Sequence, residues 1–405
     1  MLVYLKLAWR NIWRNKRRTL ITQFSMIVTL ALMIAYSGLV WGLLNQMERN
    51  ATLLGPGEIQ IHVPGYRDDR SIYKVIDRPD TIISSIEKNG ARAASRLQGF
   101  GLVSHDENSS GAQILGIDPA REKNVTRFHR HLFRGAFLAG ANEVIVGSKI
   151  AVTLDVTVGD ELVVVTQAAD GSIGNDIYTV AGILNRIGEE IDRSAIMMSL
   201  ADFRDLFSMG DVATEIAIRR VHDRQELGEL RDVIAGGIPA LEVKTWKELF
   251  PAISDMIDIA DLSIYILFFI VYLAASLITL NTMLMAVYER IRELGIMMAI
   301  GFRPLQVMTL IFVETFYLTL CAVGAGLVCG VGLSAYLTRY GLDLTSFSDG
   351  FSFAGILAEP HWFAVTNAQT VLPAAVFLVI ISFAAVLYPA LKAARLKPLE
   401  ALNFN

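Results

Sequence analysis

A single carboxylate stands inside a long apolar stretch of this 405-residue chain. Glu314 is the only charged residue of the run 307–337. Within a membrane, such a carboxylate marks a candidate functional site, because it can relay protons or pair with a cation. Glu314 lies only about two helical turns into the run. We therefore favour a bond to a neighbouring helix, or contact with the lipid headgroup region, over a role in transport chemistry.

A second group of charges lies in the polar link that precedes this run. Ile291, Leu294 and Met298 recur at helical spacing, Gly301 can end that helix, and Pro304 can start the next one. An apolar face on a helix this short needs a cover, either lipid or a soluble partner, and charges at its edges would set the register on a protein. The candidate residues are Glu289, Arg290, Ile291, Arg292, Glu293, Leu294, Gly295, Met298 and Gly301.

Motifs for catalysis are missing from the sequence. It contains no phosphate-binding Gly-x-x-x-x-Gly-Lys-Ser/Thr motif, no His-Glu-x-x-His, no Gly-x-Ser-x-Gly and no Cys-x-x-Cys. His129 and His131 lie in a basic stretch, where a solvated loop is favoured over a metal site. Cys321 and Cys329 lie in an apolar run and are interpreted as packing residues. We expect no catalysis, metal or cofactor in this chain itself.

Four apolar runs account for the composition, which is 53% hydrophobic and 19% charged. A bilayer core of about 30 Å requires about 20 apolar residues in a helix, and the runs 20–44, 262–287, 307–337 and 370–391 all satisfy this. The first run is longer than the ~7–15 apolar residues of a signal peptide and has no small-residue cleavage site. We therefore predict four transmembrane helices, and we exclude a disordered or nucleic-acid-binding protein.

The distribution of charge predicts the orientation in the membrane. Segments 1–18, 289–303 and 392–405 hold 12 basic and 3 acidic residues, whereas segment 45–261 holds 23 basic and 33 acidic. Basic flanks face the cytoplasm. The predicted segments are a basic interfacial helix at 1–18, spans at 19–44, 262–288, 304–337 and 370–391, an extracytoplasmic domain at 45–261, a cytoplasmic helix at 289–303, an extracytoplasmic link at 338–369 and a cytoplasmic tail at 392–405.

The segment 45–261 has the patterns of an α+β domain. Alternation of apolar and polar residues predicts strands at 58–63, 143–146, 161–166, 178–183 and 215–218. Helical spacing predicts helices near 82–88, 200–207 and 224–234. The segment has no cysteine, so disulfides cannot stabilise it. The predicted fold is thus an α-helical membrane protein of four spans, with a large α+β extracytoplasmic domain between spans 1 and 2.

Two further patterns concern the membrane helices. Tryptophans and basic residues alternate near the N-terminus, which suits a helix lying in the headgroup layer, or simply a basic anchor; the residues are Trp9, Arg10, Trp13, Arg14, Arg17 and Arg18. Gly326, Gly330 and Ser334 are spaced four apart in the third run, and small residues at this spacing allow two membrane helices to approach closely.

Three stretches resemble the FtsX-like (MacB-type) ABC transporter permeases. They are 5–22, which is similar to the family's entry helix, 281–301, which is similar to its second span and coupling helix, and 388–402, which is similar to its C-terminal signature. Glu314, preceded by Phe312 and Val313, is similar to a family glutamate. The order of one span, a large domain and three spans is also the same. A looser similarity points to the lipoprotein-releasing LolC/LolE branch. It involves residues 58–63, 116–119 and 154–160.

This resemblance implies a bacterial inner-membrane subunit with both termini in the cytoplasm and a two-lobed periplasmic domain. It implies a dimer with itself or with a paralogous permease, and a separate ATPase that binds ATP and Mg²⁺ and engages the coupling helix. The expected function is release of lipoproteins from the inner membrane by mechanical movement. The alternatives are a MacB-like efflux or mechanotransmitting permease that acts with a periplasmic adaptor or cell-wall hydrolase, and a membrane-anchored sensor or scaffold without an ATPase.

Overall fold

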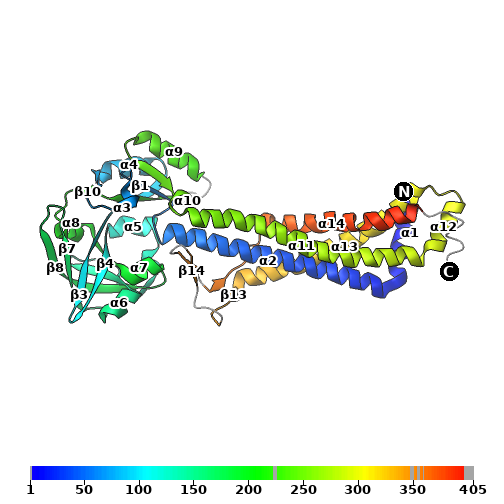
Figure 1. The fold of residues 1–405 in the computed structure, drawn as a ribbon, viewed down its shortest axis with the longest axis horizontal. Coiled ribbons are helices and arrows are strands. Elements are labelled where there is room, and N and C mark those ends of the chain that lie inside the picture. The colour runs from blue at the N-terminus through cyan, green and yellow to red at the C-terminus, as the bar shows by residue number, and fades with distance from the viewer. Residues whose placement is uncertain (1, 222–225, 347–350, 354–355, 359, 396–405) are drawn as a thin grey trace. The chain divides into compact units, whose positions relative to one another are not determined.

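The computed structural model divides into two compact units (Figure 1). It describes residues 2–221, 226–346, 351–353, 356–358 and 360–395. One unit comprises Met1–Leu44, Ile257–Phe347 and His361–Asn405, and the other comprises Asn45–Met256 and Ser348–Pro360. Residues 396–405, with part of the predicted tail and of the signature at 388–402, lie outside the described residues.

The first unit is built on long apolar helices. Among the described residues, four helices are long and apolar enough to cross a membrane, and they run alongside one another (Figure 1). They are α2 Lys16–Leu53, α11 Pro251–Glu289, α13 Pro304–Tyr340 and α14 Ala368–Ala394. The prediction of four spans with a large domain between the first and second is confirmed. α2 and α11 continue well past their apolar runs, so the chain enters and leaves the domain as uninterrupted helix.

Small residues allow α13 to pack tightly against α2. A Cβ atom on Gly330 would lie 2.8 Å from Ile34 Cδ1 and 3.1 Å from Ala31 Cα, so only glycine fits there without a shift. Gly326 makes a similar approach to Leu30. The stripe of small residues found in the sequence thus packs two helices of the same chain.

Short elements complete this unit. α1 Leu2–Ile12 leads through the 3₁₀ turn Trp13–Asn15 into α2, and α12 Ile291–Ala299 joins α11 to α13. β13 Leu342–Asp343 pairs with β16 His361–Trp362. The basic segment 1–18 is therefore not the single helix that was predicted. The Asn15 side chain accepts the backbone N–H of Arg18 at 3.4 Å, as a residue at the start of a new helix does, so Arg17 and Arg18 belong to α2.

The second unit is an α+β domain. Its main sheet runs in the order β12-β1-β11-β3-β4-β9-β6-β8-β5, and β7 pairs with both β3 and β8, so that β3, β4, β9, β6, β8 and β7 close a ring. The strands are β1 Ile59–His62, β3 Ala91–His105, β4 Asn108–Ile117, β5 Leu132–Gly135, β6 Glu143–Gly147, β7 Glu161–Gln167, β8 Ile173–Leu184, β9 Ala195–Ser199, β11 Glu215–Arg220 and β12 Glu242–Thr245.

Helices and two small strand pairs surround this sheet. The strand pairs are β2 Ile76–Asp77 with β10 Val212–Ala213, and β14 Phe351–Phe353 with β15 Ile356–Ala358. The helices are α3 Tyr66–Asp69, α4 Pro79–Lys88, α5 Pro119–Val125, α6 Ser148–Leu154, α7 Glu189–Ser194, α8 Leu200–Leu206, α9 Leu227–Gly237 and α10 Trp246–Leu249, with a 3₁₀ turn at Phe128–Arg130.

Two of the domain's hydrophobic cores define its two lobes. One core gathers residues from both ends of the segment, such as Ile59, Ile83 and Ile218. The other gathers residues from its middle, such as Val164 and Phe203. β3 belongs to both, since Ala93 lies in the first core and Leu97 in the second. This is the two-lobed arrangement that the resemblance implied. All five predicted strands and the three predicted helices are found, although residues 224–225 lie outside the described residues.

Candidate functional site

The link between α11 and α13 folds as the short helix α12. Arg290 leaves helical geometry between α11 and α12, with φ −115° and ψ 10°. Gly301, with φ +104°, takes the left-handed conformation that favours glycine. Pro304 then stands in the first turn of α13, where its missing N–H costs no hydrogen bond. These residues fix α12 in place between the two long helices.

The apolar face of α12 is covered by the chain itself. Ile291 and Leu294 are buried, and Leu294 packs in a core with Val307 and Ile311 of α13. Gly295 is also buried, and Met298 is half-buried. The expectation that lipid or a soluble partner covers this face is wrong. The physical reason is that α13 turns back directly after Pro304 and presents its own apolar side chains to α12.

A buried ion pair anchors the start of α12 to α13. Arg290 Nη1 donates to both carboxylate oxygens of Glu314, at 3.0 and 3.1 Å. Asn11 Nδ2 of α1 donates to the same carboxylate at 2.7 Å. The side chains of Arg290 and Glu314 are only 9% and 7% exposed. A buried charge is costly unless it is paired and hydrogen-bonded, and Glu314 meets both conditions. Three segments that are distant in sequence therefore meet at one carboxylate.

Two exposed ion pairs lie close by, one between the turn Trp13–Asn15 and α12, and one between α2 and the end of α11. Arg14 Nη1 lies 2.6 Å from Glu293 Oε1, and Arg18 Nη1 lies 2.8 Å from Glu289 Oε2. Each exposed pair contributes about 0–1 kcal/mol, so the pair of Arg14 and Glu293 orients α12 more than it stabilises it. The structure thus brings together the basic residues near the N-terminus and the charged link, which the sequence analysis treated separately.

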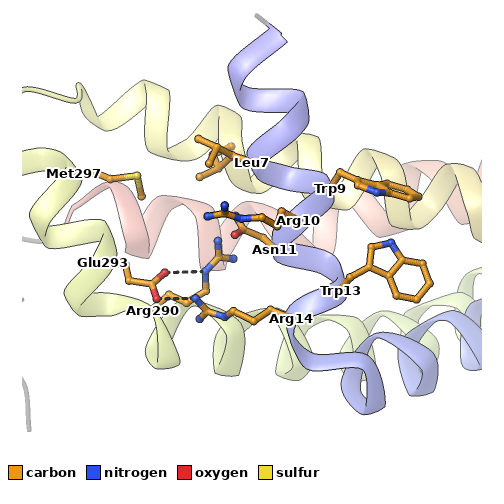
Figure 2. Close-up of a pocket in the computed structure, with 10 residues that line it drawn as sticks. Leu7, Trp9, Arg10, Asn11, Trp13, Arg14, Arg290, Glu293 and Met297 are labelled. Carbon is orange, nitrogen blue, oxygen red and sulfur yellow. Dashed lines mark hydrogen bonds and ion pairs between the residues drawn. The ribbon is translucent and has the colours of Figure 1, made fainter.

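A cavity opens between α1 and α12. Its volume is about 800 Å³. Figure 2 shows Arg10, Arg14 and Arg290 pointing toward one another across it, while Trp9 and Trp13 extend to the other side of α1. Trp9 also packs edge-on against Tyr317 of α13, at 5.7 Å between ring centroids. The Trp9 indole therefore contacts the bundle, while Arg10 and Arg14 face the cavity.

The outer face of α12 carries Arg292, which the sequence analysis named, and two isoleucines, which it missed. Arg292 is exposed, and Ile296 and Ile300 are 47% and 74% exposed. These three residues are spaced four apart and form one stripe along the helix. We call them the outer stripe. The spacing of Ile296 and Ile300 is visible in the sequence, but it would also suit a buried face. Periodicity alone does not show which of two apolar stripes on a helix is covered.

The contacts among α1, α12 and α13 form what we call the junction. The remaining predicted residues lie apart from it. Ser334 bonds Thr366 at 2.6 Å, near the other end of α13. Cys321 and Cys329 are exposed thiols on α13. His129 stacks edge-on against Phe137 in the other unit, where burial lowers its pKa. Among the described residues, no group of three or more His, Cys, Asp or Glu side chains is placed to hold a metal ion.

A second buried ion-pair network lies in the two-lobed domain. Arg96 of β3 bonds Glu122 at 2.6 and 3.1 Å and Glu215 at 3.2 Å, and it donates to the Gly55 carbonyl at 3.0 Å. Burial alone would lower the pKa of Arg96, but the two carboxylates outweigh it and raise the pKa above its usual value. This guanidinium ties β3 to α5, to β11 and to the loop after α2.

Comparisons with known proteins agree with this architecture. A MacB-like periplasmic core domain matches residues 19–235, and the FtsX-like permease C-terminal region matches 265–398. The chain is 23% identical to a lipoprotein-releasing system transmembrane protein LolC of Neisseria meningitidis, over 77% of this chain and 78% of that protein. It is 26% identical to a pyoverdine export ATP-binding/permease protein PvdT of Pseudomonas fluorescens, over 100% of this chain and 59% of that protein.

One solved structure is also similar. The periplasmic region of MacB from Actinobacillus actinomycetemcomitans aligns with 48% of this chain and 92% of its own, at 12% identity and a TM-score of 0.36. The match to the periplasmic core domain spans more than half of the present chain, and the permease match covers α12 and α13. The chain therefore belongs to the FtsX-like permeases with a MacB-like periplasmic core domain, a family of non-catalytic transmembrane subunits of ABC transporters.

Proposed function

We propose that a separate ABC ATPase, which binds ATP and Mg²⁺, docks on the outer stripe of α12 and drives movements of the two-lobed domain that release lipoproteins from the inner membrane. The observation that carries this proposal is the buried pair of Arg290 and Glu314. A helix that must transmit a push needs a rigid connection to the spans. The pair supplies that connection at the start of α12, while the outer stripe stays exposed.

Two unbroken helices, α11 and α2, begin or end beside α12 and continue into the segment of the domain. α11 runs without a break from Pro251 to Glu289, and α2 from Lys16 to Leu53. A shift of α12 therefore moves stiff elements rather than loops. The basic segments at this end of the bundle support a cytoplasmic location for α12 and for both termini, which leaves the domain in the periplasm. The active unit is a dimer, with a second copy or with a paralogous permease.

Lipoprotein release is supported by the LolC relative, whose alignment covers most of both chains. The export function in the printed name of PvdT supports a second candidate. In that case the domain would act on a periplasmic adaptor or a cell-wall hydrolase, and the chain would be a MacB-like efflux or mechanotransmitting permease. Both candidates have an ATPase docked on α12 and the same contacts among α1, α12 and α13. They differ only in the partner of the two-lobed domain.

Docking of the ATPase is tested by changing the outer stripe. The double variant Arg292→Glu with Ile296→Asp should lower the amount of ATPase that co-purifies with the chain in detergent at least tenfold, because interface hot spots contribute about 2 kcal/mol or more. The matched control is Arg339→Glu, which makes the same charge reversal in the last turn of α13. Normal ATPase recovery with the double variant would contradict docking at α12. Absence of any ATPase from wild-type preparations would favour a sensor or scaffold.

The cargo is tested by depletion of the chain followed by membrane fractionation. If the chain releases lipoproteins, outer-membrane lipoproteins should accumulate in the inner-membrane fraction within a few generations, as judged by radiolabelled palmitate. The control is an integral outer-membrane barrel protein, whose distribution should not change. Normal lipoprotein sorting combined with sensitivity to exported compounds, or with a cell-division defect, would support the second candidate instead.

A further inference from the structure

The cavity between α1 and α12 has the features of a site for an amphiphilic anion. We propose that it binds the phosphate headgroup of an anionic phospholipid, with the first carbons of the acyl chains against its apolar wall. This ligand would lie between α1 and α12, and its presence would make the position of α12 depend on the lipid around it. The inference does not depend on the cargo of the transporter.

The size and lining of the cavity suit such a ligand. Its volume of about 800 Å³ is within the range of about 300–1,000 Å³ that small-molecule sites occupy. Arg10, Arg14 and Arg290 supply the charged side, as Figure 2 shows. Leu7, Met297 and Leu310 supply an apolar side. A wall that is cationic on one side and apolar on the other matches a lipid better than it matches a fully solvated anion.

The cationic side has unused hydrogen-bonding capacity. Arg290 Nε is buried and has no hydrogen-bond partner, since the nearest carboxylate oxygen, of Glu293, lies 3.7 Å away. A phosphate oxygen in the cavity would satisfy this donor. Arg10 forms no ion pair with any side chain that the structure describes. A buried donor without a partner is costly, so a ligand that accepts from it is favoured.

The charge balance favours an anion. The carboxylates near the three arginines are Glu293, which contacts Arg14 and Arg290, and Glu314, which is bound to Arg290. Three guanidinium groups thus face two carboxylates, and one positive charge is left over. Guanidinium groups bind phosphate in a planar, two-point geometry. A cation or a neutral headgroup would leave Arg10 uncompensated.

The neighbouring tryptophans point to a membrane lipid as the source of the phosphate. Trp9 and Trp13 are both about half exposed, and their rings meet edge to face at 6.0 Å. Exposed indoles at the end of an apolar bundle are typical of the membrane–water interface. They place the cavity at headgroup depth, where a lipid reaches it without leaving the bilayer. A free phosphate has the same charge but gains nothing from the apolar side.

The test compares two nearby arginines, Arg10 in α1 and Arg17 in the first turn of α2. Arg10 lines the cavity, whereas Arg17 does not, and both are exposed. The purified full chain in detergent is mixed with phosphatidylglycerol or phosphatidylcholine, and bound lipid is counted by native mass spectrometry. We expect phosphatidylglycerol to bind in preference to phosphatidylcholine. Arg10→Gln should weaken that binding about tenfold, which is the effect of losing one charged contact of about 1.4 kcal/mol, and Arg17→Gln should not.

A second variant tests the volume without changing the charge. Met297→Trp should fill the apolar side and reduce retention of phosphatidylglycerol, whereas Arg10→Lys should keep most of it.

Equal losses with Arg10→Gln and Arg17→Gln would overturn the proposal, because they would show a general attraction of the basic segment. Equal binding of the two lipids would also overturn it. Displacement of the lipid by millimolar inorganic phosphate would show a site for soluble anions and would overturn the lipid assignment.

Discussion

Replacing Glu314 by alanine should lower the free energy of unfolding by about 3–5 kcal/mol, because it leaves the Arg290 guanidinium buried without a carboxylate. Asn11 would lose its acceptor in the same step, since its amide donates to Glu314. The expected result is loosening of α12 and α1 from α13. Unfolding by titration with sodium dodecyl sulfate in mixed micelles measures the change, and limited proteolysis at 289–303 should become faster.

The matched control for this change is Glu289→Ala. Glu289 also pairs with an arginine, but the pair with Arg18 is exposed, so its loss should cost no more than about 1 kcal/mol. The double variant Arg290→Met with Glu314→Leu removes both buried charges and should recover much of the stability lost by Glu314→Ala. If Glu314→Ala and Glu289→Ala were equally stable, the buried pair would not be what anchors α12.

The partners of Glu314 illustrate what sequence can and cannot predict. Its intramembrane position follows from counting apolar residues, because a span needs about 20 of them. Its bond to Asn11 joins residues 303 positions apart, and nothing in either segment indicates which helices are neighbours. The sequence also does not show which face of α12 is buried. Ile291 with Leu294, and Ile296 with Ile300, both recur at helical spacing, and only the position of α13 decides which pair is covered.

Strand β3 shows why part of the domain was not predicted. Its residues 91–105 are rich in alanine and glycine and do not alternate, because most of the strand is buried on both faces. Gly99 lies within β3, and Gly116 lies within the neighbouring strand β4. In the structure, a Cβ on Gly99 would lie 2.5 Å from the Phe207 ring, and one on Gly116 would lie 2.7 Å from Phe203. These glycines make room for two stacked rings that come from a later helix.

The two-lobed domain is expected to depend on Arg96 in the same way as the bundle depends on Glu314. Arg96→Ala leaves Glu122 and Glu215 buried without a cation, and this should destabilise the domain by about 3–5 kcal/mol. Because β3 belongs to both cores, hydrogen exchange in the full chain should rise in both lobes together. The control Arg204→Ala loses an exposed pair with Asp211 and should leave exchange unchanged. Faster exchange confined to α5 would mean that Arg96 only positions that helix, and that the lobes are joined by apolar contacts alone.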